Sequence, residues 1–158
     1  GLAKELSESE KVADGLYRMT GLTGAIRYMA PEVGMSQPYC LKADVYSWSK
    51  VMWNIMALEP PMGLYTNSML IDRVFKKGYR PAINEKWPHR VGELMKACWS
   101  DNDQERPNFT KIMKVLRKTA QAEDPEIKDF MAESDAVSGT SGFSTRSSSR
   151  SRVSSKQE

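Results

Sequence analysis

The sequence of 158 residues contains little that could hold a disulfide scaffold or a metal ion. Its two cysteines, Cys40 and Cys98, lie far apart, so a disulfide-rich secreted fold is excluded. The single histidine, His89, cannot complete a zinc site with them, and a lone histidine at the start of a helix is typical of a surface or capping residue. We therefore expect no metal ligands in this chain.

Long hydrophobic runs and an excess of one charge are also lacking. The most apolar stretch, residues 51–58, is far shorter than the ~18 residues of a membrane span, so we expect no membrane partner. No basic-then-apolar leader opens the chain, which makes the cytoplasm the default location. The formal net charge of +3 is too small to indicate nucleic acid by itself.

The composition changes near residue 133. Of the 26 residues from 133 to 158, ten are serine and few are bulky and apolar, which predicts a disordered tail. The basic segment 146–152 is typical of a solvated tail with phosphorylation sites. An RNA-binding Arg/Ser-rich tail is the alternative, but no aromatic residues interleave for base stacking, so nucleic acid is an unlikely partner.

The first 132 residues predict a mainly α fold. Residues 1–40 contain five glycines and no sustained period, which indicates a long irregular segment. Apolar residues at spacings of three and four then predict four helices, with a loop at 79–87, a polar connection at 100–106 and a short frayed helix at 125–132. The predicted helices span residues 43–58, 67–77, 88–99 and 107–120.

Local signals give the ends and faces of these helices. The apolar residues of 43–58 predict a helix that is buried on most sides and is stopped by Pro60. Thr66 or Asn67 can cap the second helix, and Gly78 can end it in the left-handed conformation. Pro107 suits the first turn of the fourth helix.

Short motifs occur in a fixed order along this helical region. Ala-Pro-Glu stands at 30–32 after Tyr28-Met29, Asp-Val-Tyr-Ser-Trp at 44–48, Cys-Trp at 98–99 and Arg-Pro at 106–107. Together they resemble the C-terminal lobe of a eukaryotic protein kinase, in which Ala-Pro-Glu closes the activation segment. The wording of the motifs is most similar to the tyrosine-kinase-like group, whose members mostly phosphorylate serine and threonine. The resemblance implies a partial kinase domain at 1–122, followed by a short helix and the Ser/Arg-rich tail at 123–158.

The resemblance also implies roles for single residues. Gly1 would be the glycine of the kinase Asp-Phe-Gly motif, and Glu32 and Arg106 would form a buried ion pair between the activation segment and the helices. Asp44 would accept backbone N–H bonds from the catalytic loop, although an acidic residue in a first helical turn is also favoured by the helix dipole alone. The catalytic aspartate, the ATP-binding lysine and the Mg²⁺-binding aspartate would all lie upstream.

The loop before Ala-Pro-Glu would face the protein substrate. It contains Gly24, Ala25, Arg27 and Tyr28, and kinases generally carry threonine or serine at the position of Ala25. That hydroxyl would bond to the catalytic aspartate, so Ala25 raises the alternative of a weak enzyme or a pseudokinase that acts as a protein-interaction module.

Hydroxyls in the predicted activation segment are candidate phosphorylation sites for an upstream kinase, because a phosphate there could order the loop against arginines. These residues are Ser7, Ser9, Tyr17, Thr20 and Thr23. The resemblance thus implies a Ser/Thr protein kinase that transfers the γ-phosphoryl of Mg²⁺-bound ATP to protein substrates in signal transduction. We expect the 158 residues alone to be poorly stable and to have no ATP turnover.

Overall fold

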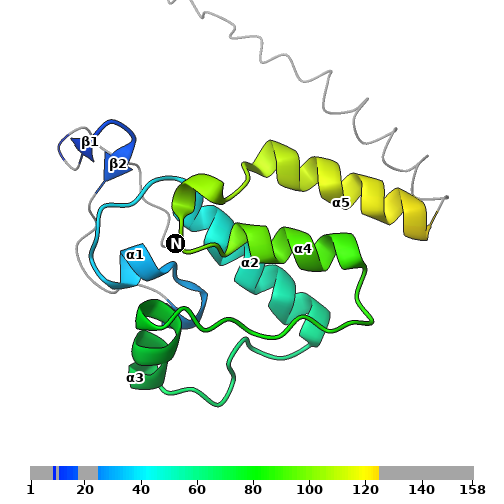
Figure 1. Ribbon diagram of the computed structural model, residues 1–158, viewed down its shortest axis with the longest axis horizontal. Helices are drawn as coiled ribbons and strands as arrows, with labels where there is room; N and C mark the ends of the chain where they lie inside the picture. The colour runs from blue at the N-terminus through cyan, green and yellow to red at the C-terminus, as the bar shows by residue number, and fades with distance from the viewer. Residues whose placement is uncertain (1–8, 10, 18–24, 125–158) are drawn as a thin grey trace, which may run out of the picture.

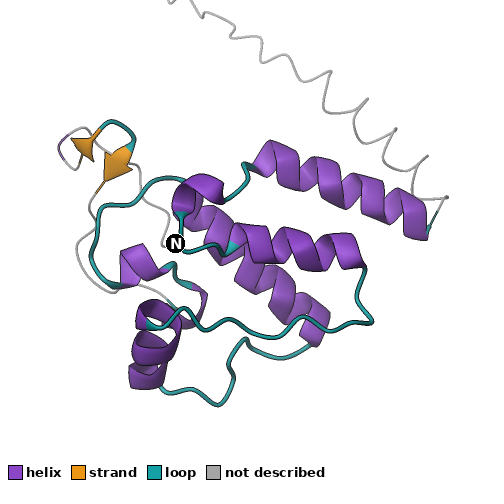
Figure 2. Cartoon of the chain, in the orientation of Figure 1, coloured by secondary structure: helices purple, strands orange, loops and turns teal. Residues whose placement is uncertain are grey.

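The structure of the protein is a computed structural model that describes residues 9, 11–17 and 25–124. These residues form a small helical unit with one two-stranded hairpin, which agrees with the predicted mainly α class (Figures 1 and 2). The elements are β1 (Lys11–Ala13), β2 (Leu16–Tyr17), η2 (Ile26–Tyr28), α1 (Pro31–Gly34), α2 (Lys42–Ala57), α3 (Asn67–Met69), η3 (Leu70–Lys76), α4 (His89–Cys98), η4 (Asp103–Glu105) and α5 (Phe109–Glu123).

Helix α2 lies at the centre of the packing. It contacts α4, which in turn contacts α5, so that the three helices lie next to one another (Figure 1). The predicted bounds agree with α2, and so does the predicted burial on most sides, because only Asp44, Val51 and Ile55 of its 16 residues are exposed. Val51 and Ile55 are 45% and 62% exposed, whereas Ser49 and Lys50 are buried. The spacing of apolar residues therefore predicted the helix and its extensive burial, but not that Val51 and Ile55 are exposed while the polar Ser49 and Lys50 are buried.

The ends of α4 and α5 show how closely the sequence predicts helix boundaries. Helix α4 starts one residue after Pro88, as its apolar spacing predicts. Helix α5 begins only at Phe109, because the side chain of Asn108 accepts a hydrogen bond from the Lys111 N–H and caps the first turn. Pro107 therefore precedes the helix instead of lying in its first turn, which corrects the prediction.

The predicted second helix is divided into α3 and the π-helical segment η3. The Thr66 side chain accepts a hydrogen bond from the Met69 N–H, and Gly78 ends the segment with a φ of 68°. The segment packs against α1, where the Phe75 ring lies over Gly34. A Cβ atom at Gly34 would be 2.1 Å from the Phe75 ring, so only glycine fits there without a displacement.

Short elements interrupt the stretch that was predicted to be irregular. Strands β1 and β2 form an antiparallel hairpin, and the backbone of Tyr17 makes two hydrogen bonds with that of Tyr39, of 2.8 and 2.9 Å. Strands of two or three residues are too short to show an alternating pattern, which explains why the sequence did not predict them.

The structure describes only part of what the sequence addresses. The predicted helix at 125–132 and the Ser/Arg-rich tail lie outside the described residues. Among the described residues, no helix is both long enough and apolar enough to cross a membrane.

Candidate functional site

The Ala-Pro-Glu segment is joined to the helical unit by a charged pair of side chains. Arg106 donates from Nη1 to Glu32 Oε1 over 2.7 Å and from Nη2 to Glu32 Oε2 over 3.0 Å. The side chain of Arg106 is fully buried and that of Glu32 is 14% exposed. Two parallel bonds between a guanidinium and a carboxylate fix both the distance and the relative orientation of the two groups. Two segments that are 74 residues apart in the sequence are held together in this way.

Arg106 has further partners that surround its guanidinium. Its Nε donates to the Ser100 carbonyl over 2.9 Å, and Nη1 also donates to the Lys42 carbonyl over 3.2 Å. The Lys42 ammonium in turn donates to the Arg106 carbonyl. A lysine at position 106 could not make this set of bonds, because an ammonium is a point charge without a planar fork of donors.

Tyr46 of α2 lies at the centre of a cluster of cationic side chains. The guanidinium carbons of Arg80 and Arg106 are 5.1 and 5.2 Å from the centroid of its ring, and the Lys50 ammonium is 5.2 Å from it. Arg80 also donates to the carbonyls of Val74 and Trp99 and pairs with Asp101. Cations within about 6 Å of an aromatic centroid are attracted by the electrons of the ring. Tyr46 thus connects α2 with the segments that carry Arg80 and Arg106.

Two polar atoms in this cluster are buried without a hydrogen-bond partner among the described residues, Tyr46 Oη and Lys50 Nζ. Burial, with a smaller contribution from the nearby Arg80, lowers the pKa of the Lys50 ammonium to about 6. Burial raises the pKa of the Tyr46 hydroxyl well above its ordinary value. The helical periodicity did not predict this cluster, whose only sequence signal is a lysine between apolar residues in the middle of a helix.

The loop before Ala-Pro-Glu is fixed to the segment that follows α2. The Arg27 guanidinium donates to the carbonyls of Pro61 (2.9 Å), Met62 and Tyr65 (3.2 Å). The hydroxyl of Tyr28 donates to Asn54 Oδ1 of α2 over 2.6 Å. Because both side chains are used for these contacts, they shape the loop rather than project freely from it.

Other predicted site residues have simpler surroundings. Ala25 is exposed and precedes η2, where its carbonyl accepts a hydrogen bond from the Tyr28 N–H over 2.9 Å. Asp44 is exposed in the first turn of α2. Of the candidate phosphorylation sites, Ser9 is exposed and Tyr17 is half-buried against the core. The remaining predicted residues lie outside the described ones: Gly1, Ser7, Thr20, Thr23 and Gly24.

The cysteines and the histidine are dispersed in the structure. Cys98 is fully buried, and burial raises the pKa of its thiol to about 12. Cys40 is half-buried, and its thiol donates to Asp103 Oδ2 over 3.2 Å. His89 is exposed at the start of α4. Within residues 9, 11–17 and 25–124, no three His, Cys, Asp or Glu side chains lie together as metal ligands would.

Comparison with known proteins agrees with this geometry. Residues 1–116 match the family described as protein tyrosine and serine/threonine kinase. The chain belongs to this protein kinase family. The match includes both the Ala-Pro-Glu segment and the arginine that pairs with it, so the ion pair links two parts of one kinase domain.

Individual relatives of this kinase-family chain are protein kinases by name, and several are named serine/threonine-protein kinases. The chain is 37% identical over 100 residues to serine/threonine-protein kinase STY17 of Arabidopsis thaliana, covering 63% of this chain and 18% of that protein. It is 32% identical over 146 residues to serine/threonine-protein kinase STY46 of Arabidopsis thaliana, covering 87% and 25%. It is 34% identical over 107 residues to mitogen-activated protein kinase kinase kinase 7 of Drosophila melanogaster, covering 68% and 16%. The chain thus spans a quarter or less of the length of these three relatives.

Proposed function

We propose that the complete protein transfers the γ-phosphoryl group of ATP to serine or threonine hydroxyls of protein substrates. In this proposal, the present chain supplies the end of the activation segment and the helices that support it. The observation that carries the proposal is the bidentate pair between Glu32 and Arg106. It holds the Ala-Pro-Glu segment on the helical unit, and Arg27 fixes the loop just before it. A loop fixed at both places is suited to position a peptide for phosphoryl transfer, a reaction that depends mainly on positioning.

We further propose that ATP and Mg²⁺ bind outside the described residues. No three side chains with carboxylate, thiol or imidazole groups come together in the described ranges. The kinase family uses ATP and Mg²⁺. We therefore place both binding sites, together with the catalytic aspartate, in parts of the complete protein outside the described residues, and we assign no catalytic step to a residue of this chain.

An exposed apolar surface on α2 supports the proposal that further residues of the complete protein pack against this chain. Val51 and Ile55 are 45% and 62% exposed and lie four residues apart in a row along one side of the helix, and Leu58, which directly follows the helix, is 91% exposed. Such a row on a central helix is typical of a surface that another element covers. In the proposed kinase, residues outside this chain pack there.

A pseudokinase that binds partner proteins is the second candidate, and Ala25 is the observation that favours it. Its methyl side chain cannot donate the hydroxyl hydrogen bond that would help to hold a catalytic base. The surrounding framework of Arg27, Tyr28, Glu32 and Arg106 is compatible with either function.

The two candidates are separated by measuring phosphoryl transfer with the complete protein. The intact mass of the protein from its native source comes first, and radiolabelled ATP with casein as a generic substrate follows. We expect transfer onto serine or threonine, and we expect Ala25→Thr to increase it. An absence of transfer by both forms would favour the pseudokinase. The 158-residue chain, tested in parallel, is expected to be inactive.

Regulation by an upstream kinase is part of the proposal. The described candidate sites differ in access, since Ser9 is exposed and Tyr17 is half-buried against the core. Mass spectrometry of the native protein would locate phosphate on the activation segment. Because the exposed Ser9 is more accessible to a kinase than Tyr17, phosphate on Tyr17 alone would contradict this expectation. A cytoplasmic location stays an expectation from the sequence.

A further inference from the structure

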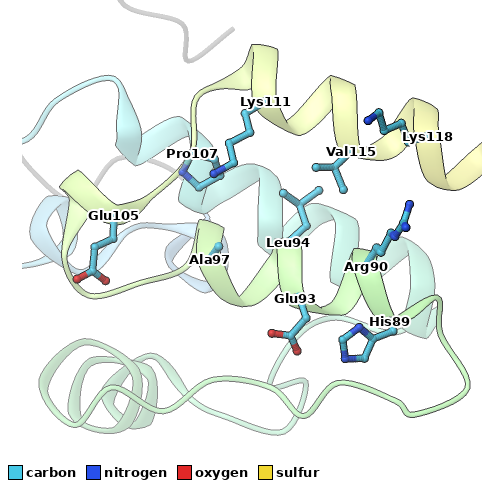
Figure 3. A pocket seen from close by; sticks show the side chains of 10 residues that line it. All are labelled: His89, Arg90, Glu93, Leu94, Ala97, Glu105, Pro107, Lys111, Val115 and Lys118. Atoms are coloured by element: carbon cyan, nitrogen blue, oxygen red, sulfur yellow. The ribbon is translucent and has the colours of Figure 1, made fainter.

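A groove of about 490 Å³ runs between α4 and α5 (Figure 3). Its floor is apolar and is formed by Leu94 and Ala97 of α4, Val115 of α5 and the nearby Pro107. In Figure 3, Leu94 and Val115 point toward one another from the two helices. We propose that this groove binds an acidic amphipathic helix of a partner protein, which places an apolar side chain on the floor and carboxylates against the cations of the rim.

The cations of the rim determine the charge of the partner. Lys111 reaches from α5 toward α4, and Arg90 reaches from α4 toward α5 (Figure 3). Lys118 lines the groove from α5. All three are exposed, and no carboxylate of the described chain pairs with them. The carboxylates of an anionic partner could each pair with one of these three cations. Electrostatic attraction of this kind also speeds association.

The two acidic residues that line the groove are already engaged within the chain. The Lys96 ammonium lies 2.8 Å from Glu93 Oε1, and this hydrogen bond holds the pKa of the Glu93 carboxyl below its ordinary value. The carboxylate of Glu105 accepts hydrogen bonds from Ser100 Oγ (2.8 Å) and Asn102 Nδ2 (3.2 Å). These carboxylates therefore do not neutralise the cations across the groove.

The spacing on α5 determines the pattern of the partner. Lys111, Val115 and Lys118 are separated by four and three residues, so they share one side of the helix. The two lysines are about 10 Å apart along the helix axis at ~1.5 Å per residue. A partner helix that lies along α5 has the complementary pattern when it carries two carboxylates seven residues apart. An apolar residue then stands between them, three or four positions after the first carboxylate. The inference does not depend on phosphoryl transfer, because no residue of the groove belongs to the loop at 25–28.

The test uses the complete protein and a phage-displayed library of helical peptides of about 15 residues, a length at which an isolated helix begins to be stable. Enrichment of acidic residues seven positions apart, with an apolar residue between them, is the expected result. The best peptide is then labelled, and its affinity is measured by fluorescence anisotropy. Failure to enrich any peptide, or enrichment without an acidic bias, would overturn the proposal.

Paired variants locate the binding surface. We expect Lys111→Glu with Lys118→Glu to weaken binding by about tenfold or more, and Val115→Ser to weaken it severalfold. The matched control, Lys86→Glu with Lys114→Glu, changes net charge equally at exposed lysines that do not line the groove, and it should leave affinity within about twofold. Circular dichroism checks that each variant keeps its helices.

Two outcomes would replace the peptide groove with another explanation. Equal losses in both double variants would show that binding follows net charge alone. Competition by an oligoribonucleotide at equal mass, insensitive to Val115→Ser, would indicate a phosphate-binding surface. Either result would overturn the proposal.

Discussion

The ammonium nitrogen of Lys50 lies 4.7 Å from the centroid of the Trp99 ring, inside the helical core. Lys50 is only 1% exposed, and its ammonium has no hydrogen-bond partner among the described residues. Attraction to an aromatic ring offsets part of the cost of burying a charge, but it does not replace the lost water. The lysine therefore gives up its proton more readily in the folded chain than in the unfolded one, as its lowered pKa of about 6 indicates.

We predict that Lys50 makes the stability of the chain depend on pH. The folded pKa is about 6 and the ordinary value is 10.5, so between these values the unfolded state binds one more proton. The free energy of unfolding should therefore rise with pH, by about 1.4 kcal/mol per pH unit from this residue alone. Below about pH 6 the amine is charged in both the folded and the unfolded state. The full cost of burying its charge then lowers the free energy of unfolding.

The measurement is urea unfolding between about pH 6.5 and about pH 8, a range below the ionisation of tyrosine and cysteine in the unfolded chain. Lys50→Met should raise stability and remove most of the slope. The other charged or titratable groups near the amine are Tyr46, Arg80, Asp101 and Arg106, and the substitution leaves all four in place. Lys86→Met, at an exposed lysine, is the control and should keep the slope. An unchanged slope in Lys50→Met would show that the amine is solvated.

The burial of Lys50 could not be predicted from the sequence. Periodicity predicted α2 from its apolar residues, but a row of apolar residues exists on each side of that helix. The sequence predicted burial on most sides of this helix without saying which apolar residues lie on the exposed side, and in the described structure these are Val51 and Ile55. Which row is inward depends on the positions of Trp99 and Arg80, and both come from segments far along the chain. Local spacing contains no information about these partners.

The resemblance to kinases predicted a long-range contact that the helical periodicity could not predict. The pairing of Glu32 with Arg106 joins positions 74 residues apart, and only the order of the motifs suggested it. The contacts of Arg27 with backbone carbonyls at 61–65 were not predicted, because a carbonyl acceptor leaves no trace in the side-chain sequence. Helix caps were predicted only in part: the sequence predicted Thr66 as a cap, but not Asn108.

Arg106→Lys should destabilise the chain although the charge is kept. The substitution removes the second bond to Glu32 and the bond to the Ser100 carbonyl, and charged hydrogen bonds contribute about 1.5–3 kcal/mol each. We expect a loss of about 3–6 kcal/mol in urea unfolding followed through tryptophan fluorescence. Arg73→Lys, at an exposed arginine, should change stability by less than about 0.5 kcal/mol. Equal effects at the two positions would mean that the fork geometry of Arg106 is unimportant.

Leu58→Gly should stabilise the chain. Leu58 follows α2 in the left-handed conformation with a φ of 56°, and it is 91% exposed. Glycine adopts this conformation without the steric cost of a Cβ, and little packing is lost at so exposed a position. We expect a gain of about 0.5–1 kcal/mol in the free energy of unfolding. Gly15→Ala, at an exposed position with a φ of 71° and no heavy atom near the added Cβ, is the reverse control and should destabilise. A loss of stability in Leu58→Gly would indicate that the leucine side chain packs in solution.

Gly34→Ala should destabilise the contact between α1 and η3. The new Cβ would lie 2.1 Å from the Phe75 ring, which is 5% exposed and has little room to move. Overpacking of this kind costs about 1–3 kcal/mol, to be measured by urea unfolding. Phe75→Leu alone should also destabilise, because it leaves a cavity, but in combination with Gly34→Ala it should cost less than the sum of the two. Gly63→Ala is the control, since its nearest atom would be 3.4 Å away. Strictly additive losses at 34 and 75 would contradict a direct contact between the ring and the glycine.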